Sequence, residues 1–208
     1  MGIYPELETL GLEELIGCFQ ALPPEGEEYA AGYYLEVAER ICQCGEKGIQ
    51  FLKQQLSNPD VNRVRAALAA LSERVSSPDT VTLLLTYLSD SRPLVAAEAI
   101  DGLRHNDFHM AMEQIIPLIS HPSPYIIVGA ALRFVSAFSR ERAVPLLLNA
   151  LKHPDFLVRE TACDELGNWE VIEAIPELIR LLGDPHPHVC QAARTALADL
   201  RRAQKEKA

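Results

Sequence analysis

The sequence of 208 residues has no long hydrophobic run and is poor in cysteine, aromatic residues and basic residues. No segment approaches the roughly 18 to 20 consecutive apolar residues that a transmembrane helix requires, so we expect no membrane insertion. The opening residues, MGIYPELETLGLEEL, also lack the basic region and apolar core of a secretory signal. A cytoplasmic location is therefore expected.

Charge and cysteine content restrict the class of partner. Nineteen Lys and Arg residues oppose 29 Asp and Glu residues, and the net charge of −10 disfavours binding to nucleic acid or to anionic lipid. The five cysteines are sparse and odd in number, so no disulfide framework is expected. The hydrophobic content of 48% is sufficient for a packed core, and we expect the partner to be another protein.

The chain shows no strand pattern but repeats itself every 31 or 32 residues. Five anchor positions lie in short polar turns: Pro59, Ser91, Pro122, Pro154 and Pro185. Apolar residues recur three, seven and ten residues before each anchor and, with one exception at Arg63, four, eight and twelve residues after it. Spacings of three and four residues mark one face of a helix, so each repeat is predicted to be a helix, a turn and a second helix.

One position of the repeat is always alanine. Eight residues after the anchors stand Ala67, Ala99, Ala130, Ala162 and Ala193. A small side chain allows two helices to approach closely, and a Leu at such a position is expected to overpack the interface at a cost of roughly 1 to 3 kcal/mol. Pro117 interrupts a predicted first helix and should kink or shorten it.

Residues 1–45 are predicted to form a capping helical pair, because they contain two amphipathic segments without the internal pattern of the repeat. Residues 46–208 are predicted to form five repeats with a basic C-terminal tail, in one continuous solenoid. The fold class predicted is therefore all-α, an α-solenoid or superhelix of about six helical hairpins.

The segment DFLVRETACDELGNWEVIEAIPELIRLLGDPHPHVCQAARTALADL, residues 155–200, resembles tandem HEAT repeats of the short type found in phycobilisome lyases. The features shared are an Asp-Pro turn, a Val-Arg pair, paired small residues and a helix that opens with Ala-Ile-Pro. The resemblance implies a scaffold or adaptor, or alternatively a bilin lyase subunit or a chaperone for a tetrapyrrole or phycobiliprotein. A further alternative is a partner in iron or iron-sulfur assembly. By the same match, Arg159 is expected to pair with Asp155 or Asp184 in a structural role.

The function that we favour from the sequence is a non-catalytic scaffold that needs no cofactor, and a bilin or iron remains the alternative. In a stack of hairpins the second helices line the concave face, and YIIVGAALRFVSAF, residues 125–138, is apolar on nearly every side. Either neighbouring repeats bury it or it exposes an apolar patch; we predict the patch, as a groove for a basic or partly apolar segment of another protein. The residues of the predicted groove are Asp101, His105, Tyr125, Val128, Leu132, Asp164 and Trp169.

Three cysteines are weak candidates for a metal site. Cys42 and Cys44 lie close to a predicted helix end at Gly45, and Cys18 lies on the preceding helix. Three thiolates without a fourth ligand form an incomplete site, so free thiols are the competing interpretation. The sequence offers no catalytic residues.

Overall fold

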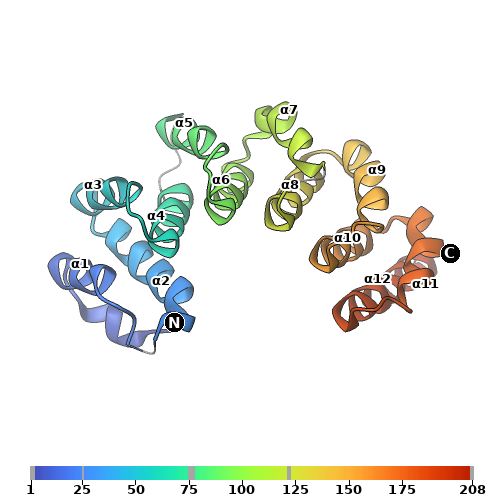
Figure 1. The fold of residues 1–208 in the computed structure, drawn as a ribbon, viewed down its shortest axis with the longest axis horizontal. Coiled ribbons are helices and arrows are strands. Elements are labelled where there is room, and N and C mark those ends of the chain that lie inside the picture. The colour runs from blue at the N-terminus through green and yellow to red at the C-terminus, as the bar shows by residue number, and fades with distance from the viewer. Residues whose placement is uncertain (1–2, 25, 75–77, 121–122, 207–208) are drawn as a thin grey trace. The chain divides into compact units, whose positions relative to one another are not determined.

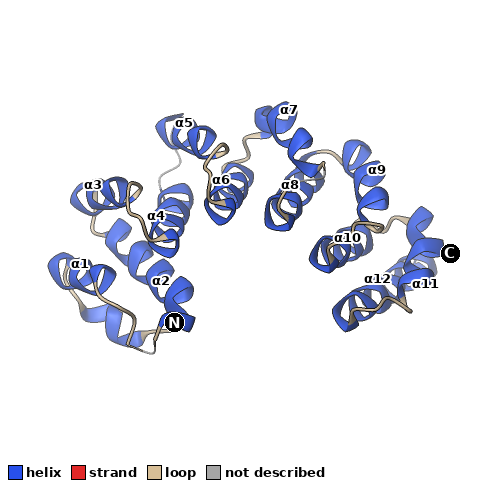
Figure 2. Ribbon diagram, in the orientation of Figure 1, coloured by secondary structure: helices blue, strands red, loops and turns tan. Residues whose placement is uncertain are grey.

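The computed structural model describes residues 3–24, 26–74, 78–120 and 123–206, and within these ranges the chain consists of helices and loops (Figures 1 and 2). It forms two compact units, Met1–Phe108 and His109–Ala208. The elements of the first unit are η1 (Pro5–Thr9), α1 (Leu12–Gln20), η2 (Glu27–Tyr29), α2 (Ala30–Gln43), α3 (Glu46–Gln55), α4 (Val61–Arg74), α5 (Pro78–Tyr87) and α6 (Pro93–His105). Those of the second unit are η3 (His109–Ala111), α7 (Met112–Ile115), η4 (Ile116–Ile119), α8 (Tyr125–Phe138), α9 (Arg140–Ala150), α10 (Phe156–Asn168), η5 (Ile172–Ala174), α11 (Ile175–Leu181) and α12 (Pro187–Glu206).

The helices form the predicted hairpins, three in each unit. The odd-numbered helices are the first helices and the even-numbered helices are the second helices. In the first unit α2 packs on α4 and α4 on α6, and in the second unit α8 packs on α10 and α10 on α12. The predicted boundary at residue 45 falls between α2 and α3. The prediction of one continuous solenoid over residues 46–208 stays a prediction.

The anchor turns share one hydrogen bond. The side chain of the residue before the anchor accepts a hydrogen bond from the backbone N–H of the residue after it. The acceptors are Asn58, Asp90, His153 and Asp184, at distances of 2.9, 2.9, 3.1 and 2.9 Å. This local bond fixes the turn that separates the two helices of a hairpin. The anchor Pro122 lies outside the described residues.

The alanine of each repeat lies in the core, as predicted. All five of these alanines are completely buried. Helices α10 and α12 also approach each other closely, since a Cβ added to Gly167 would lie 2.9 Å from the Cα of Ala196. Small residues therefore set how closely the second helices pack.

Two departures from the repeat have a physical explanation. Pro117 ends α7 after four residues, and the chain continues as the short 3-10 helix η4, which confirms the predicted interruption. Arg63 replaces the apolar residue of the other repeats and donates hydrogen bonds to the carbonyls of Phe19 and Gln20, at 2.9 Å each, and to that of Ala21 at 3.0 Å. A cation there satisfies carbonyl groups that the end of α1 leaves unpaired.

Candidate interaction surfaces

The apolar helix α8 is mostly core, which corrects the predicted exposed patch. The side chains of Val128 and Leu132 are each 1% exposed, whereas Tyr125 at the start of the helix is 44% exposed. Helices α9 and α10 and the short helix η4 pack around α8. A helix that is apolar on every side is buried where neighbouring helices cover its sides. The neighbours of α8 cover its central residues in this way. Val128 and Leu132 therefore offer no exposed apolar surface to a partner.

The polar residues predicted to flank the groove are divided between the units. Asp101 and His105 lie on α6 of the first unit, and the guanidinium of Arg104 contacts both, at 3.4 Å from the Asp101 carboxylate and 3.0 Å from the His105 ring. Asp164 and Trp169 belong to the second unit, where Asp164 is exposed. The two sets are therefore described as two separate surfaces.

The surface of the first unit, which we call the α4–α6 face, is built around an ion pair. Arg65 of α4 lies 3.3 Å from the carboxylate of Glu98 on α6. These two residues line a shallow hollow of about 50 Å³ with Ala31, Leu35, Asn62, Ala66 and Ala69. Burial raises the pKa of Glu98 above its ordinary value, Arg65 opposes this shift, and the nearby charge of Asp101 adds to it. Each carboxylate of this face therefore has an arginine beside it, Arg65 for Glu98 and Arg104 for Asp101.

The surface of the second unit, which we call the α8–α12 face, carries Tyr125, Leu157, Glu160, Asp164 and His188. Glu160 and Asp164 are one helical turn apart on α10, where like charges repel each other. Although Asp164 remains exposed, the protein around it partly removes it from solvent, and this desolvation first and the charge of Glu160 second raise its pKa. The ring of His188 on α12 lies 3.8 Å from the Glu160 carboxylate. Leu157, which is half-buried, precedes Glu160 by three residues on the same helix. The exposed Tyr125 lies one helical turn before Gly129 of α8, where an added Cβ would lie 3.7 Å from the hydroxyl of Thr161 on α10.

Two possible nucleophiles of α10, the buried Cys163 and the half-buried Thr161, are not activated. Burial raises the pKa of the Cys163 thiol to about 12, so this sulfur stays protonated at neutral pH. The hydroxyl of Thr161 donates to the carbonyl of Leu157 at 2.9 Å within its own helix. Neither of these two positions therefore holds an activated nucleophile.

The three candidate metal-binding cysteines lie in different environments. Cys42 is buried, Cys18 is half-buried and Cys44 is exposed, with its thiol 3.3 Å from the carbonyl of Arg40. Over the part of the chain that the structure describes, no three His, Cys, Asp or Glu side chains are grouped to hold a metal ion. The iron and iron-sulfur alternative gains no support from this arrangement.

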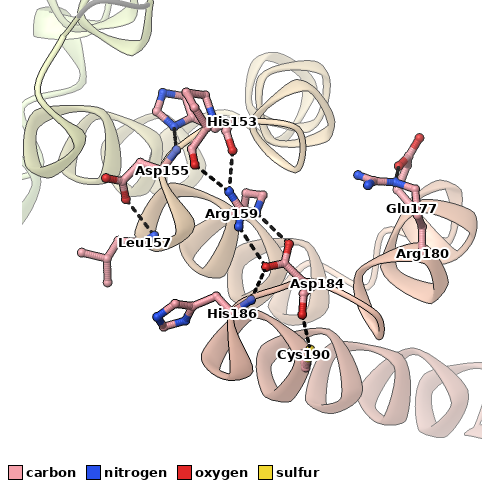
Figure 3. Close-up of polar contacts among 10 residues, drawn as sticks. His153, Asp155, Leu157, Arg159, Glu177, Arg180, Asp184, His186 and Cys190 are labelled. Carbon is pink, nitrogen blue, oxygen red and sulfur yellow. Dashed lines mark hydrogen bonds and ion pairs between the residues drawn. The ribbon is translucent and has the colours of Figure 1, made fainter.

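Arg159 has the structural role expected of it, and its partner is Asp184 (Figure 3). Its guanidinium donates to both carboxylate oxygens of Asp184 at 2.9 Å, and to the carbonyls of His153 and Pro154 at 2.7 and 2.9 Å. Asp155, the other predicted partner, instead accepts from the backbone N–H of Leu157 and caps α10. Arg159 thus ties one anchor turn to the next.

The described residues form an all-α protein built from helical hairpins that repeat along the chain, and part of the chain matches a known repeat family. Residues 144–208 match the family model described as HEAT repeats. A comparison with the curated proteins found no match. In a search for helices in the described residues, none was long and apolar enough to cross a membrane.

Solved structures with a similar fold extend the likeness beyond residues 144–208. An engineered protein is similar at 19% identity, with a TM-score of 0.56 over 92% of this chain and 96% of the other. The complex of CpcE and CpcF of phycocyanin lyase from Nostoc sp. PCC7120 is also similar at 19% identity, with a TM-score of 0.53 over 96% of this chain and 86% of the other. The predicted fold class is confirmed, and the resemblance to HEAT repeats is confirmed over residues 144–208.

Sequence reasoning selected Asp101 and Asp164 but not Glu98 and Glu160, although the repeat places all four on second helices. The available signal was the spacing of the carboxylates: Glu98 and Asp101 are three residues apart, and Glu160 and Asp164 four. Such pairs on one helix face are unfavourable unless a cation lies near them. The apolar character of α8 drew attention to its centre, which the structure buries.

Proposed function

We propose that the protein is a non-catalytic scaffold that binds a basic segment of another protein through its second-helix faces. The observation that carries the proposal is the placement of two carboxylates, Glu160 and Asp164, one helical turn apart on the α8–α12 face, where the charge of Glu160 disfavours the ionised form of Asp164. A Lys or Arg side chain from a partner would relieve that repulsion and form charge-assisted hydrogen bonds. Tyr125 and Leu157 beside the pair supply apolar contacts, and aromatic side chains of this kind are enriched where proteins bind.

The α4–α6 face supports the same proposal with a second example. Arg65 pairs with Glu98 on this face, and the charge of Asp101 opposes the ionisation of Glu98. A basic partner with several Lys or Arg residues fits two acidic faces better than an acidic partner does. The similar CpcE and CpcF structure is itself a complex of two proteins, in keeping with a protein partner for this chain.

The test is a binding assay with a defined probe, a fluorescein-labelled peptide of alternating Lys and Leu residues followed by anisotropy. The double variant Glu160→Gln with Asp164→Asn should weaken binding at least about fivefold, since each charge-assisted contact contributes roughly 1 kcal/mol or more. Glu141→Gln with Glu173→Gln is the matched control, because both residues are exposed and the net charge changes equally. Equal weakening by both variants would show attraction to overall charge alone and would refute the proposed site.

The tetrapyrrole alternative gains less from the geometry. A bilin carrier needs cations for the propionates of its ligand, and the sequence offers Arg133 and Arg159 near the second-helix face. Arg159 is fully engaged by Asp184 and two backbone carbonyls, and Arg133 is half-buried. An absorption spectrum of a bilin that changes on addition of the protein would favour this alternative over the peptide-binding scaffold.

A further inference from the structure

Helix α11 exposes an apolar stripe on the side that faces away from the preceding hairpin. Ile179 is 53% exposed and Leu182 is 37% exposed. Glu177 points the other way, because its carboxylate lies 3.2 Å from the ammonium of Lys152 at the end of α9. Ile179 and Leu182 follow Glu177 by two and five residues, which corresponds to rotations of roughly 200° and 140° about the helix axis. They therefore lie on the opposite side of the helix from Glu177. Ile172 in η5 is also half exposed and precedes Ile179 by two helical turns.

The equivalent side chains of the preceding hairpin are covered. Leu148 and Leu151 stand 31 residues before Ile179 and Leu182; Leu148 is half-buried, and Leu151 is completely buried. Leu151 lies in a groove whose other wall is the following hairpin, which contributes Arg180, Asp184 and Pro185. The exposed stripe of α11 is therefore the face on which the repeat normally stacks its next hairpin.

Helix α12 adds positive charge to the same face. Ala196 packs against Gly167 of α10, so the opposite side of α12 faces away from the preceding hairpin. Ala198 is two residues further on, roughly 200° round the helix, and it is exposed together with Arg194 and Arg201. The outer side of the last hairpin is thus apolar on α11 and basic on α12. We call this surface the end face.

The N-terminal hairpin of the same chain has the opposite charge. The first 46 residues contain ten glutamates and no aspartate, and Arg40 is their only basic residue. The short helix η1 buries Leu7 and exposes Glu6 and Glu8, and α1 begins with the exposed Glu13 and Glu14. Two large apolar side chains, Ile3 and Leu22, are also strongly exposed there.

We propose that the end face binds the acidic N-terminal hairpin of a second copy of this chain, head to tail. The apolar stripe of α11 would meet exposed apolar side chains, and Arg194 and Arg201 would meet glutamates. Because the two contacting surfaces differ, the contact is heterologous, and a copy bound through one surface still carries the other. The contact is partly electrostatic between exposed groups, so salt weakens it.

The first measurement is the weight-average mass of the full chain by sedimentation equilibrium, over rising protein concentration at about 20 mM and about 500 mM NaCl. The mass should exceed the 23.0 kDa of one chain at low salt, rise with concentration and fall with salt. A mass that stays at 23.0 kDa throughout would overturn the proposal.

Two variants, each with one of the two contacting surfaces disrupted, distinguish a head-to-tail contact from other modes of dimerisation. Ile179→Glu blocks the end face, and Glu6→Arg with Glu13→Arg blocks the acidic end; each variant alone should be monomeric. Mixed together they should form a one-to-one complex, because each retains one intact surface. Met110→Glu is the matched control, since Met110 is an exposed apolar residue elsewhere in the second unit and its substitution should leave the association unchanged.

The outcomes distinguish the possible occupants. If Ile179→Glu abolishes association and mixing it with the Glu6→Arg, Glu13→Arg variant does not restore it, the end face binds the end face of another copy. The head-to-tail proposal then fails. If Met110→Glu disrupts association as strongly as Ile179→Glu, the end face is not the contact. Thermal melting of each variant tests whether it is folded. We expect every variant to fold, because the substituted side chains are exposed.

Discussion

Replacing Arg159 by Met should show how much one charged bridge contributes to the stack of repeats. The guanidinium makes four hydrogen bonds, two to the Asp184 carboxylate and two to the carbonyls of His153 and Pro154. The side chains of Arg159 and Asp184 are only 12% and 4% exposed. Methionine preserves most of the apolar stem of arginine, so the substitution chiefly removes charge and hydrogen bonds.

The expected loss follows from the burial of the partner that remains. Breaking a buried ion pair by removing one member costs roughly 3 to 5 kcal/mol, because the other charge is left uncompensated. Asp184 keeps the hydrogen bond from the N–H of His186, so we expect about 3 kcal/mol in the free energy of unfolding. For a chain of this length that corresponds to a fall in Tm of roughly 6 to 12 °C.

The assay is urea unfolding in a double-mutant cycle with Asp184→Asn, which isolates the coupling between the two side chains. Arg180→Met is a sharp control, because Arg180 lies 2.7 Å from Glu177 but both side chains are substantially exposed. The control should change the free energy of unfolding by no more than about 0.5 kcal/mol, although its ion pair is the shorter one. A coupling energy between Arg159 and Asp184 below about 0.5 kcal/mol would refute the reasoning.

The same pair predicts a pH dependence of definite sign. The hydrogen bonds from Arg159 lower the pKa of Asp184 in the folded protein. The pair therefore stabilises the fold fully above the unfolded pKa of about 4, and this stabilisation is lost as the pH falls through the lower folded pKa. The difference in Tm between the wild type and Arg159→Met should accordingly shrink in acid. A difference that grows below about pH 4 would contradict the assignment.

Three further predictions concern packing, thiol reactivity and the acidic face. Gly48→Ala should lower the free energy of unfolding in urea by about 3 kcal/mol or more, because the added Cβ would lie 1.8 Å from the Ile41 carbonyl oxygen. The control is Gly17→Ala, where the added Cβ would have no heavy atom within 4 Å. It should be neutral or slightly stabilising. Iodoacetamide should modify the exposed Cys44 in the native protein and Cys163 only after unfolding, as followed by mass spectrometry, and native modification of Cys163 would contradict its burial. The raised pKa of Asp164 means that its ionisation lowers stability as the pH rises through the folded pKa, so Asp164→Asn should flatten that part of the profile of Tm against pH; an unchanged profile would count against the shift.

The arrangement of hairpins was predictable because it depends on local periodicity. Five buried alanines at one offset, polar turns at the anchors and a broken helix at Pro117 all follow from spacing and backbone chemistry along the sequence. Arg159 was also assigned its role in advance, although only the structure chose Asp184 over Asp155.

The candidate site was predictable only in part, because exposure depends on how far neighbouring helices reach. Hydrophobicity marked Val128, Leu132 and Tyr125 alike, and packing against α9 and α10 buries the first two while leaving the third exposed. Local sequence thus determined which residues form each helix and which side of it is apolar. Tertiary packing alone decided which apolar sides are covered. It buries the centre of α8 and leaves Ile179 of α11 exposed, because burial results from contacts between segments distant in the sequence.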